Sequence, residues 1–146
     1  YVDESTNLYL GDEEISFYHV PGHTEDSMLV VTSKQVFTGD FLFTGESGVG
    51  RDDLPSGRVH AHWESLQVMS ELSPALLVCT GHEAPGVEMQ TLEWNYQHNP
   101  ILQMNDFADY LKWQNDTTAQ LGYVSKIKVA LPANLFGEIP DEIPWL

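Results

Sequence analysis

The sequence predicts a mixed α/β fold, α+β in its arrangement, with strands in the first ~80 residues and helices after them. Two observations predict it. Short apolar and β-branched runs, separated by Gly, Pro and Asp turn signals, fill the first part of the chain. After residue 86, apolar residues recur mainly at helical spacing. With 146 residues, 42% of them hydrophobic, the chain has the length and composition of one folded domain.

Five runs are expected to form strands. They cover residues 8–10, 15–20, 27–32, 35–38 and 75–80. The last run is apolar throughout, which is typical of a strand buried on both faces. Between the fourth and fifth strands, a glycine-rich loop at residues 44–57 precedes a helix expected over residues 59–72, which Pro74 helps to end.

Two further helices are expected in the second part of the chain. One covers residues 88–97 and ends before Asn99–Pro100, because the residue before a proline disfavours helix. The other starts with Asn105 as its cap and runs through Tyr110. The proline-containing tail from Leu131 is expected to be irregular.

The charge and the single cysteine restrict the partners and the compartment. The chain has 22 acidic and 6 basic residues, a formal charge of −16, which argues against nucleic acid and against anionic membrane surfaces as partners. It has no apolar stretch long enough for a transmembrane helix, and its first residues do not resemble a signal peptide. Cys79 lies in an apolar run and is expected to be buried. We expect a cytoplasmic protein acting on a small molecule.

Three apolar runs end in a glycine that is followed at once by a possible metal ligand. These corners are Gly22–His23, Gly39–Asp40 and Gly81–His82. Glycine lets the backbone turn sharply, and strand ends along one sheet edge are where α/β folds place their chemistry. Two imidazoles and a carboxylate suit Zn²⁺ with one bound water, or Fe(II) with open positions for substrate and oxygen. We therefore predict that His23, Asp40 and His82 gather around a metal.

Other polar residues have more than one interpretation. His19 either supports the metal site or is a half-buried strand histidine. Residues 45–52 nearly match the phosphate loop G-x-x-x-x-G-K-[ST], but Arg51 replaces the Lys and Asp52 the hydroxyl residue, which disfavours nucleotide binding. Arg51 is instead expected to bind an anionic group of the substrate or to anchor the loop through Asp52 or Asp53. A surface salt bridge is the alternative.

Several motifs, taken together, resemble those of a known family. The segments are Pro21–Thr24, Phe37–Asp40, Gly81–Glu83, residues 50–57, residues 98–102 and residues 127–135. The first three, in this order and spacing, resemble the second half of the metallo-β-lactamase fold. The fourth resembles the G-R-x-D-(F/L)-x-x-G loop of its glyoxalase II and persulfide dioxygenase branch. The last two resemble the N-P-R-L and A-V-P-A-N segments of persulfide dioxygenases.

The resemblance implies an αββα sandwich with its metal site at one end of two packed sheets. The H-x-H-x-D-H motif that supplies the family's remaining ligands is absent from the sequence. Residues 1–146 are therefore expected to be the C-terminal half of one such domain. This half alone should bind metal weakly. It should also expose an apolar sheet face that the missing N-terminal half, or a second copy in a homo-oligomer, would cover.

The resemblance also implies an activity. In persulfide dioxygenases one Fe(II) is held by two histidines and an aspartate, and His23 and Asp40 match one histidine and that aspartate. His82 matches a residue that lies near the iron there, but that binds a second metal in binuclear hydrolases. The first hypothesis is oxidation of glutathione persulfide by O₂ to sulfite and glutathione, with Asp40 catalytic and Arg51 binding substrate carboxylates.

Two alternatives remain open. One is a thioester hydrolase of the glyoxalase II type, in which Asp40 would bridge two zinc ions that share a hydroxide. The other is a catalytically inactive half that serves as a scaffold or subunit.

Overall fold

The structure, a computed structural model, describes residues 2–121 and residue 137, and it has the expected mixed α/β composition. Its elements, in chain order, are β1 (Leu8–Leu10), β2 (Glu13–His19), β3 (Met28–Val31), β4 (Gln35–Gly39), the 3₁₀ helix η1 (Gly45–Ser47), α1 (Val59–Ser65), the 3₁₀ helix η2 (Leu66–Glu71), β5 (Leu77–Thr80), α2 (Leu92–His98) and α3 (Phe107–Leu121). Strands thus dominate the first part of the chain and helices the second. The expected tail from Leu131 and the motif at residues 127–135 lie outside the described residues.

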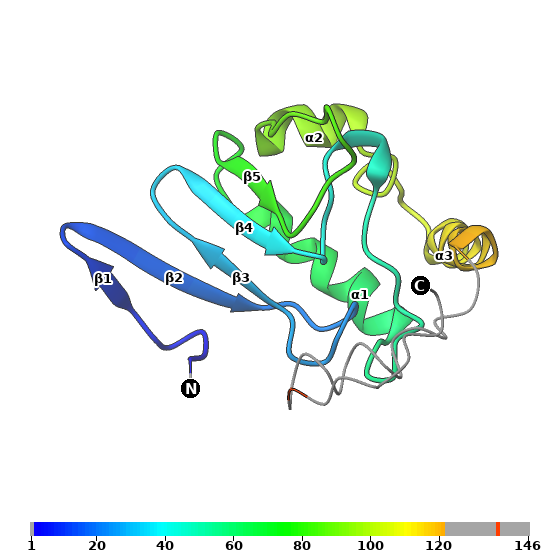
Figure 1. Cartoon of the computed structure of the whole chain (residues 1–146), viewed down its shortest axis with the longest axis horizontal. Helices are drawn as coiled ribbons and strands as arrows, with labels where there is room; N and C mark the ends of the chain where they lie inside the picture. The colour runs from blue at the N-terminus through cyan, green and yellow to red at the C-terminus, as the bar shows by residue number, and fades with distance from the viewer. Residues whose placement is uncertain (1, 122–136, 138–146) are drawn as a thin grey trace.

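The strands form one five-stranded sheet in the order β1-β2-β3-β4-β5 (Figure 1). The first four pair antiparallel with their neighbours, whereas β5 pairs parallel with β4. A parallel pair needs a crossover connection, and α1 and η2 lie on that connection. Because β2, β4 and β5 consequently run in the same direction, their carboxyl ends meet at one edge of the sheet.

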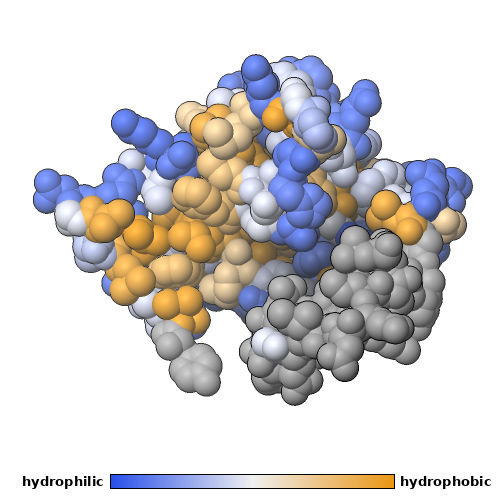
Figure 2. Space-filling model, viewed as in Figure 1, coloured by the Kyte–Doolittle hydropathy of each residue, from blue (hydrophilic) through white to orange (hydrophobic). Residues whose placement is uncertain are grey.

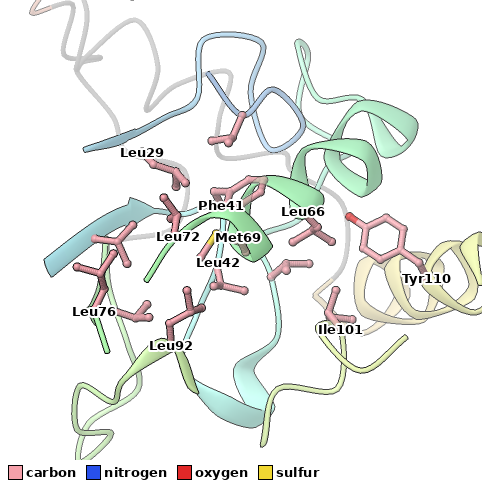
Figure 3. Packing of buried hydrophobic residues seen from close by; sticks show 14 residues of the cluster. Leu29, Phe41, Leu42, Leu66, Met69, Leu72, Leu76, Leu92, Ile101 and Tyr110 are labelled. Carbon is pink, nitrogen blue, oxygen red and sulfur yellow. The ribbon is translucent and has the colours of Figure 1, made fainter. Parts of the chain in front are cut away.

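The core lies between the sheet and the helices (Figure 3). Leu29, Val36 and Val78, from the three strands β3 to β5, are fully buried in one cluster with Met69 of η2. Tyr110 of α3 joins the same cluster and is also fully buried. This cluster fixes the positions of the strand ends from which the candidate ligands project.

The helix expected over residues 59–72 is wrong in its second half, because α1 ends at Ser65 and a 3₁₀ helix continues the chain. Leu66, Met69 and Leu72 are all buried, and they follow one another at intervals of three residues. A 3₁₀ helix has three residues per turn, so it places this series on one face, whereas an α-helix would rotate it away from the sheet.

The predicted starts of the last three elements also need correction. The fifth strand begins at Leu77, two residues later than expected. α2 begins at Leu92 because Thr91 accepts a hydrogen bond from the Trp94 N–H and pairs with Leu77 in an isolated bridge. The cap of α3 is Asp106, not Asn105, since the Asp106 carboxylate accepts the Ala108 N–H at 2.6 Å.

No helix in the described part of the chain combines the length and apolarity needed to cross a membrane.

The sheet face away from the core is apolar (Figure 2). Phe17, Val30, Phe37 and Cys79 lie directly opposite one another in register across β2 to β5. Phe37, in an inner strand, is 41% exposed, while Cys79 is buried as expected. Leu10 of β1 and Met89 extend the exposed apolar surface. We call this surface, composed of Leu10, Phe17, Val30, Phe37, Cys79 and Met89, the open sheet face.

Candidate metal centre

The structure brings the three predicted ligands together at the common carboxyl edge of β2, β4 and β5. The Nε2 atom of His82 lies 3.3 Å from the Asp40 Oδ2 atom, and the Nε2 atom of His23 lies 3.8 Å from the same oxygen. Two ligands of one metal at bond lengths near 2.0–2.2 Å are about 3–3.5 Å apart, so the His82–Asp40 separation fits a shared ion, whereas the His23–Asp40 separation of 3.8 Å is longer. That these residues bind metal remains a prediction.

The three side chains do not by themselves make a complete site for one ion. Among residues 2–121 and 137, no three His, Cys, Asp or Glu side chains are placed so that together they could hold a metal ion. Both imidazoles face the same Asp40 oxygen, Oδ2, but the longer of the two separations, 3.8 Å, exceeds the usual spacing of two ligands on one ion. This incompleteness agrees with the absence of the H-x-H-x-D-H motif from the sequence.

His23 is held in a defined tautomer. Its Nδ1 atom lies 2.7 Å from the Arg51 carbonyl oxygen, which can only accept, so Nδ1 carries the proton. In the neutral imidazole, Nε2 is then the nitrogen without a proton, and it faces Asp40, as a metal ligand requires. The chain before it is packed too tightly for a side chain, because a Cβ on Gly22 would overlap the Cα and Cβ of His62.

Asp40 projects from a corner that only small residues can form. Gly39, at the end of β4, has a φ of 52°, a conformation that favours glycine. The Gly81 N–H donates to the Gly39 carbonyl at 2.8 Å, which ties the Asp40 corner to the His82 corner. A Cβ on Gly81 would overlap Asp40 Oδ1. The second and third glycine corners therefore pack directly against each other.

His82 is the most accessible of the three. Its side chain is 71% exposed, and its ring packs on Phe43 with 4.9 Å between ring centroids. The next residue, Glu83, accepts the Thr44 N–H at 2.6 Å and the Ser47 hydroxyl at 3.2 Å. Glu83 thus fixes the start of the glycine-rich loop beside the imidazole.

Arg51 anchors its loop, one of the two roles predicted for it. Its guanidinium donates to both carboxylate oxygens of Asp53, at 2.5 and 2.7 Å. This ion pair lowers the pKa of Asp53 and raises that of Arg51, in each case mainly through the hydrogen bonds. Asp52 is different, because burial raises the pKa of its carboxyl. The predicted contact of Arg51 with substrate stays a prediction.

A cavity of about 620 Å³ opens above the three side chains. Its floor is His23, Asp40 and His82, and one wall is formed by α3 through residues that include Trp113 and Thr117. This volume is in the range of small-molecule binding sites. The neighbouring groups therefore enclose a space in which a small substrate could reach all three candidate ligands.

Sequence reasoning missed three buried groups behind the cavity. His62 is fully buried, and burial lowers its pKa to about 4. Tyr110 is also fully buried, and burial raises the pKa of its phenol. The third is Gln114, which is 2% exposed and donates to the Tyr110 hydroxyl and to the Gly50 carbonyl. The helical spacing of Tyr110 and Gln114, four residues apart, is the only signal of this pairing in the sequence.

The remaining histidines lie away from the cavity. His19 contacts the Glu25 carbonyl at 2.8 Å, so it does not support the candidate ligands. His60 stacks on Phe107. His98 is the last residue of α2, and its Nδ1 donates to the Trp94 carbonyl.

Comparison with known proteins identifies the family. The model of the metallo-beta-lactamase superfamily matches residues 4–82. The chain belongs to the metallo-β-lactamase superfamily. Most members of this superfamily are metalloenzymes, and the glycine–ligand corners described above lie within or at the end of the matched segment.

Relatives in the superfamily are longer than this chain. The probable polyketide biosynthesis zinc-dependent hydrolase PksB of Bacillus subtilis is 31% identical over 117 residues, which are 77% of this chain and 50% of PksB. A hydroxyacylglutathione hydrolase of Enterobacter sp. is 33% identical over 82 residues, 56% of this chain and 31% of that protein. The crystal structure of ETHE1 from Myxococcus xanthus superposes with a TM-score of 0.79 at 28% identity, covering 91% of this chain and 58% of ETHE1. The chain thus spans about half the length of these proteins or less.

Proposed function

We propose that this chain contributes half of the active site of an iron-dependent sulfur dioxygenase that oxidises glutathione persulfide. The observation that carries the proposal is that two imidazoles, the mostly buried His23 and the exposed His82, approach one carboxylate oxygen of Asp40 in a cavity. The similarity to ETHE1 favours the dioxygenase class, because it covers 91% of this chain, whereas the match to the hydrolase PksB covers 77%.

The residues present fit a divalent metal. His23, in the tautomer with the proton on Nδ1, offers Nε2 as a ligand. Asp40 offers a carboxylate that, among the described residues, pairs with no side chain other than the two imidazoles. They would hold Fe(II) together with a ligand from outside the described chain. When bound, Fe(II) supplies the redox chemistry and open positions for the substrate sulfur and for O₂.

The protein contributes binding and orientation to the reaction. In the balanced reaction, glutathione persulfide, O₂ and water give glutathione, sulfite and two protons. The Arg51–Asp53 ion pair fixes the loop whose Arg51 carbonyl orients His23. Arg51 also lines the cavity, and we assign to it the binding of a substrate carboxylate. Trp113 and Val49 supply apolar surface for the sulfur-bearing part of the substrate.

The test is oxygen uptake on glutathione persulfide by this chain combined with an N-terminal half that carries H-x-H-x-D-H. Iron-loaded protein should consume O₂ and release sulfite, and zinc-loaded protein should not. Asp40→Asn should abolish uptake, whereas Asp106→Asn, which changes a helix cap remote from the cavity, should retain it. A combined protein that binds no transition metal would instead support an inactive scaffold.

A thioester hydrolase of the glyoxalase II type is the second candidate. It is favoured by the short His82–Asp40 separation of 3.3 Å, which suits a carboxylate shared by two metals, and by the names of the hydrolase relatives. His82→Ala separates the two candidates. It should remove one of two metals and abolish cleavage of a glutathione thioester in a hydrolase, but leave iron bound in a dioxygenase.

We also propose that the open sheet face is covered by the N-terminal half of the same domain. Supporting this are its exposed apolar side chains, such as Phe37, and the extra length of the relatives, since the matches cover only 50% of PksB and 58% of ETHE1. Phe37→Asp should abolish association with that half in analytical ultracentrifugation, and Leu111→Asp on α3 should not. Self-association of the wild-type chain that Phe37→Asp abolishes would show that a second copy covers the face instead.

A further inference from the structure

The position of the candidate ligand His23 depends on a short backbone segment, residues 48–51. The Arg51 carbonyl accepts the His23 Nδ1 proton at 2.7 Å and so selects the tautomer with a free Nε2. A shift of this carbonyl away from Nδ1 would weaken the preference, because hydrogen bonds weaken with distance and with poor alignment. What holds residues 48–51 in place therefore determines how His23 faces Asp40.

This segment has no free space around it. A Cβ on Gly50 would overlap the Asp40 carbonyl and lie 2.9 Å from His23 Nδ1. A Cβ on Gly48 would lie 2.6 Å from the Trp113 ring. The Asn99 amide, fully buried, donates to the Gly48 carbonyl at 2.9 Å. Residues 48–51 are thus confined between the candidate ligands on one side and α3 with the Asn99 turn on the other.

Gln114 provides the hydrogen bond at the next carbonyl. Its Nε2 group donates to the Gly50 carbonyl at 3.0 Å and to the Tyr110 hydroxyl at 2.8 Å. The side chain is 98% buried, yet its Oε1 atom has no hydrogen-bond partner among the described residues. A leucine or methionine would fill the same space without an unsatisfied acceptor, so packing alone does not explain a glutamine here.

We propose that Gln114 is a positioning residue for the metal centre: by holding the Gly50 carbonyl, it fixes the adjacent Arg51 carbonyl against His23 and thereby keeps His23 Nε2 available to a metal. The chain of contacts runs from Tyr110 to Gln114, then through Gly50 and Arg51 to His23. Gln114 itself touches neither the cavity floor nor the substrate space. The proposal rests on the proposed function only in treating His23 as a metal ligand.

The test is the tautomer of His23 in the metal-free full chain, measured by ¹⁵N NMR of the imidazole under alkaline conditions in which the ring is neutral. Wild-type His23 should be protonated at Nδ1. Gln114→Leu and Gln114→Met should shift the population towards protonation at Nε2. Gln97→Leu, which makes the same substitution at an exposed site on α2, should leave the tautomer unchanged.

Zn²⁺ titration of the chain gives a second measurement. Gln114→Leu should weaken Zn²⁺ binding about tenfold or more, the usual effect of losing a group that orients a ligand. A folded Gln114→Leu or Gln114→Met variant with the wild-type tautomer would overturn the proposal, and so would failure of both variants to fold, because Gln114 would then be a stability residue. If wild-type chain binds no Zn²⁺, the proposed function is in doubt, but the tautomer still decides the role of Gln114.

Discussion

Acidification should destabilise the chain through His62, a histidine that the fold keeps neutral. Its Nε2 lies 3.0 Å from the Phe41 carbonyl and donates to it, and its Nδ1 is buried without a partner among the described residues. Burial is the main cause that lowers the pKa to about 4 from the ordinary 6.5. Between these values the unfolded chain binds a proton at this position and the folded chain does not, so the free energy of unfolding must fall as the pH falls through this window.

The magnitude follows from the two pKa values. A difference of about 2.5 units corresponds to about 3 kcal/mol over the whole window, of which about 2 kcal/mol is lost between about pH 7 and about pH 5.

The assay is urea unfolding at both pH values for the wild type and for His62→Gln, which retains a donor for the Phe41 carbonyl but does not titrate. The variant should lose about 2 kcal/mol less than the wild type on acidification. His60→Gln, which changes an exposed residue of α1, should behave as the wild type does. Equal pH dependence in the wild type and His62→Gln would refute this explanation.

Three other substitutions test the packing around the site. Gly81→Ala should displace the Asp40 carboxylate, because the new Cβ would overlap Asp40 Oδ1. Zn²⁺ titration should show binding weakened about tenfold, while the melting temperature should change little. Arg51→Lys should lower the free energy of unfolding, measured in urea, by about 1–2 kcal/mol, because a lysine cannot make the paired hydrogen bonds to Asp53. An unchanged unfolding midpoint would show that the ion pair contributes little to stability. Met69→Ala should cost about 2–5 kcal/mol, since Met69 is fully buried in the core, and a loss below 1 kcal/mol would mean that the core collapses around the deletion.

Much of the fold could be predicted because its signals are local. The runs at residues 15–20, 27–32 and 35–38 became β2, β3 and β4 within two residues at each end, since β-branched and apolar runs between turn residues need little long-range information. The helix starts were less predictable. Thr91 caps α2 with its side chain, and its backbone also pairs with Leu77 of β5, a contact that no local pattern records.

The sequence by itself determined the chemistry of the candidate site: an imidazole or carboxylate placed directly after a glycine at three strand ends. The tertiary structure alone decided that these ends meet, because the directions of β2, β4 and β5 depend on pairing across the sheet. It also decided that Gln114 reaches Gly50, 64 residues away, and that His62 becomes neutral. Residue type and spacing act over a few positions, whereas burial and long-range hydrogen bonds exist only once distant segments have packed together.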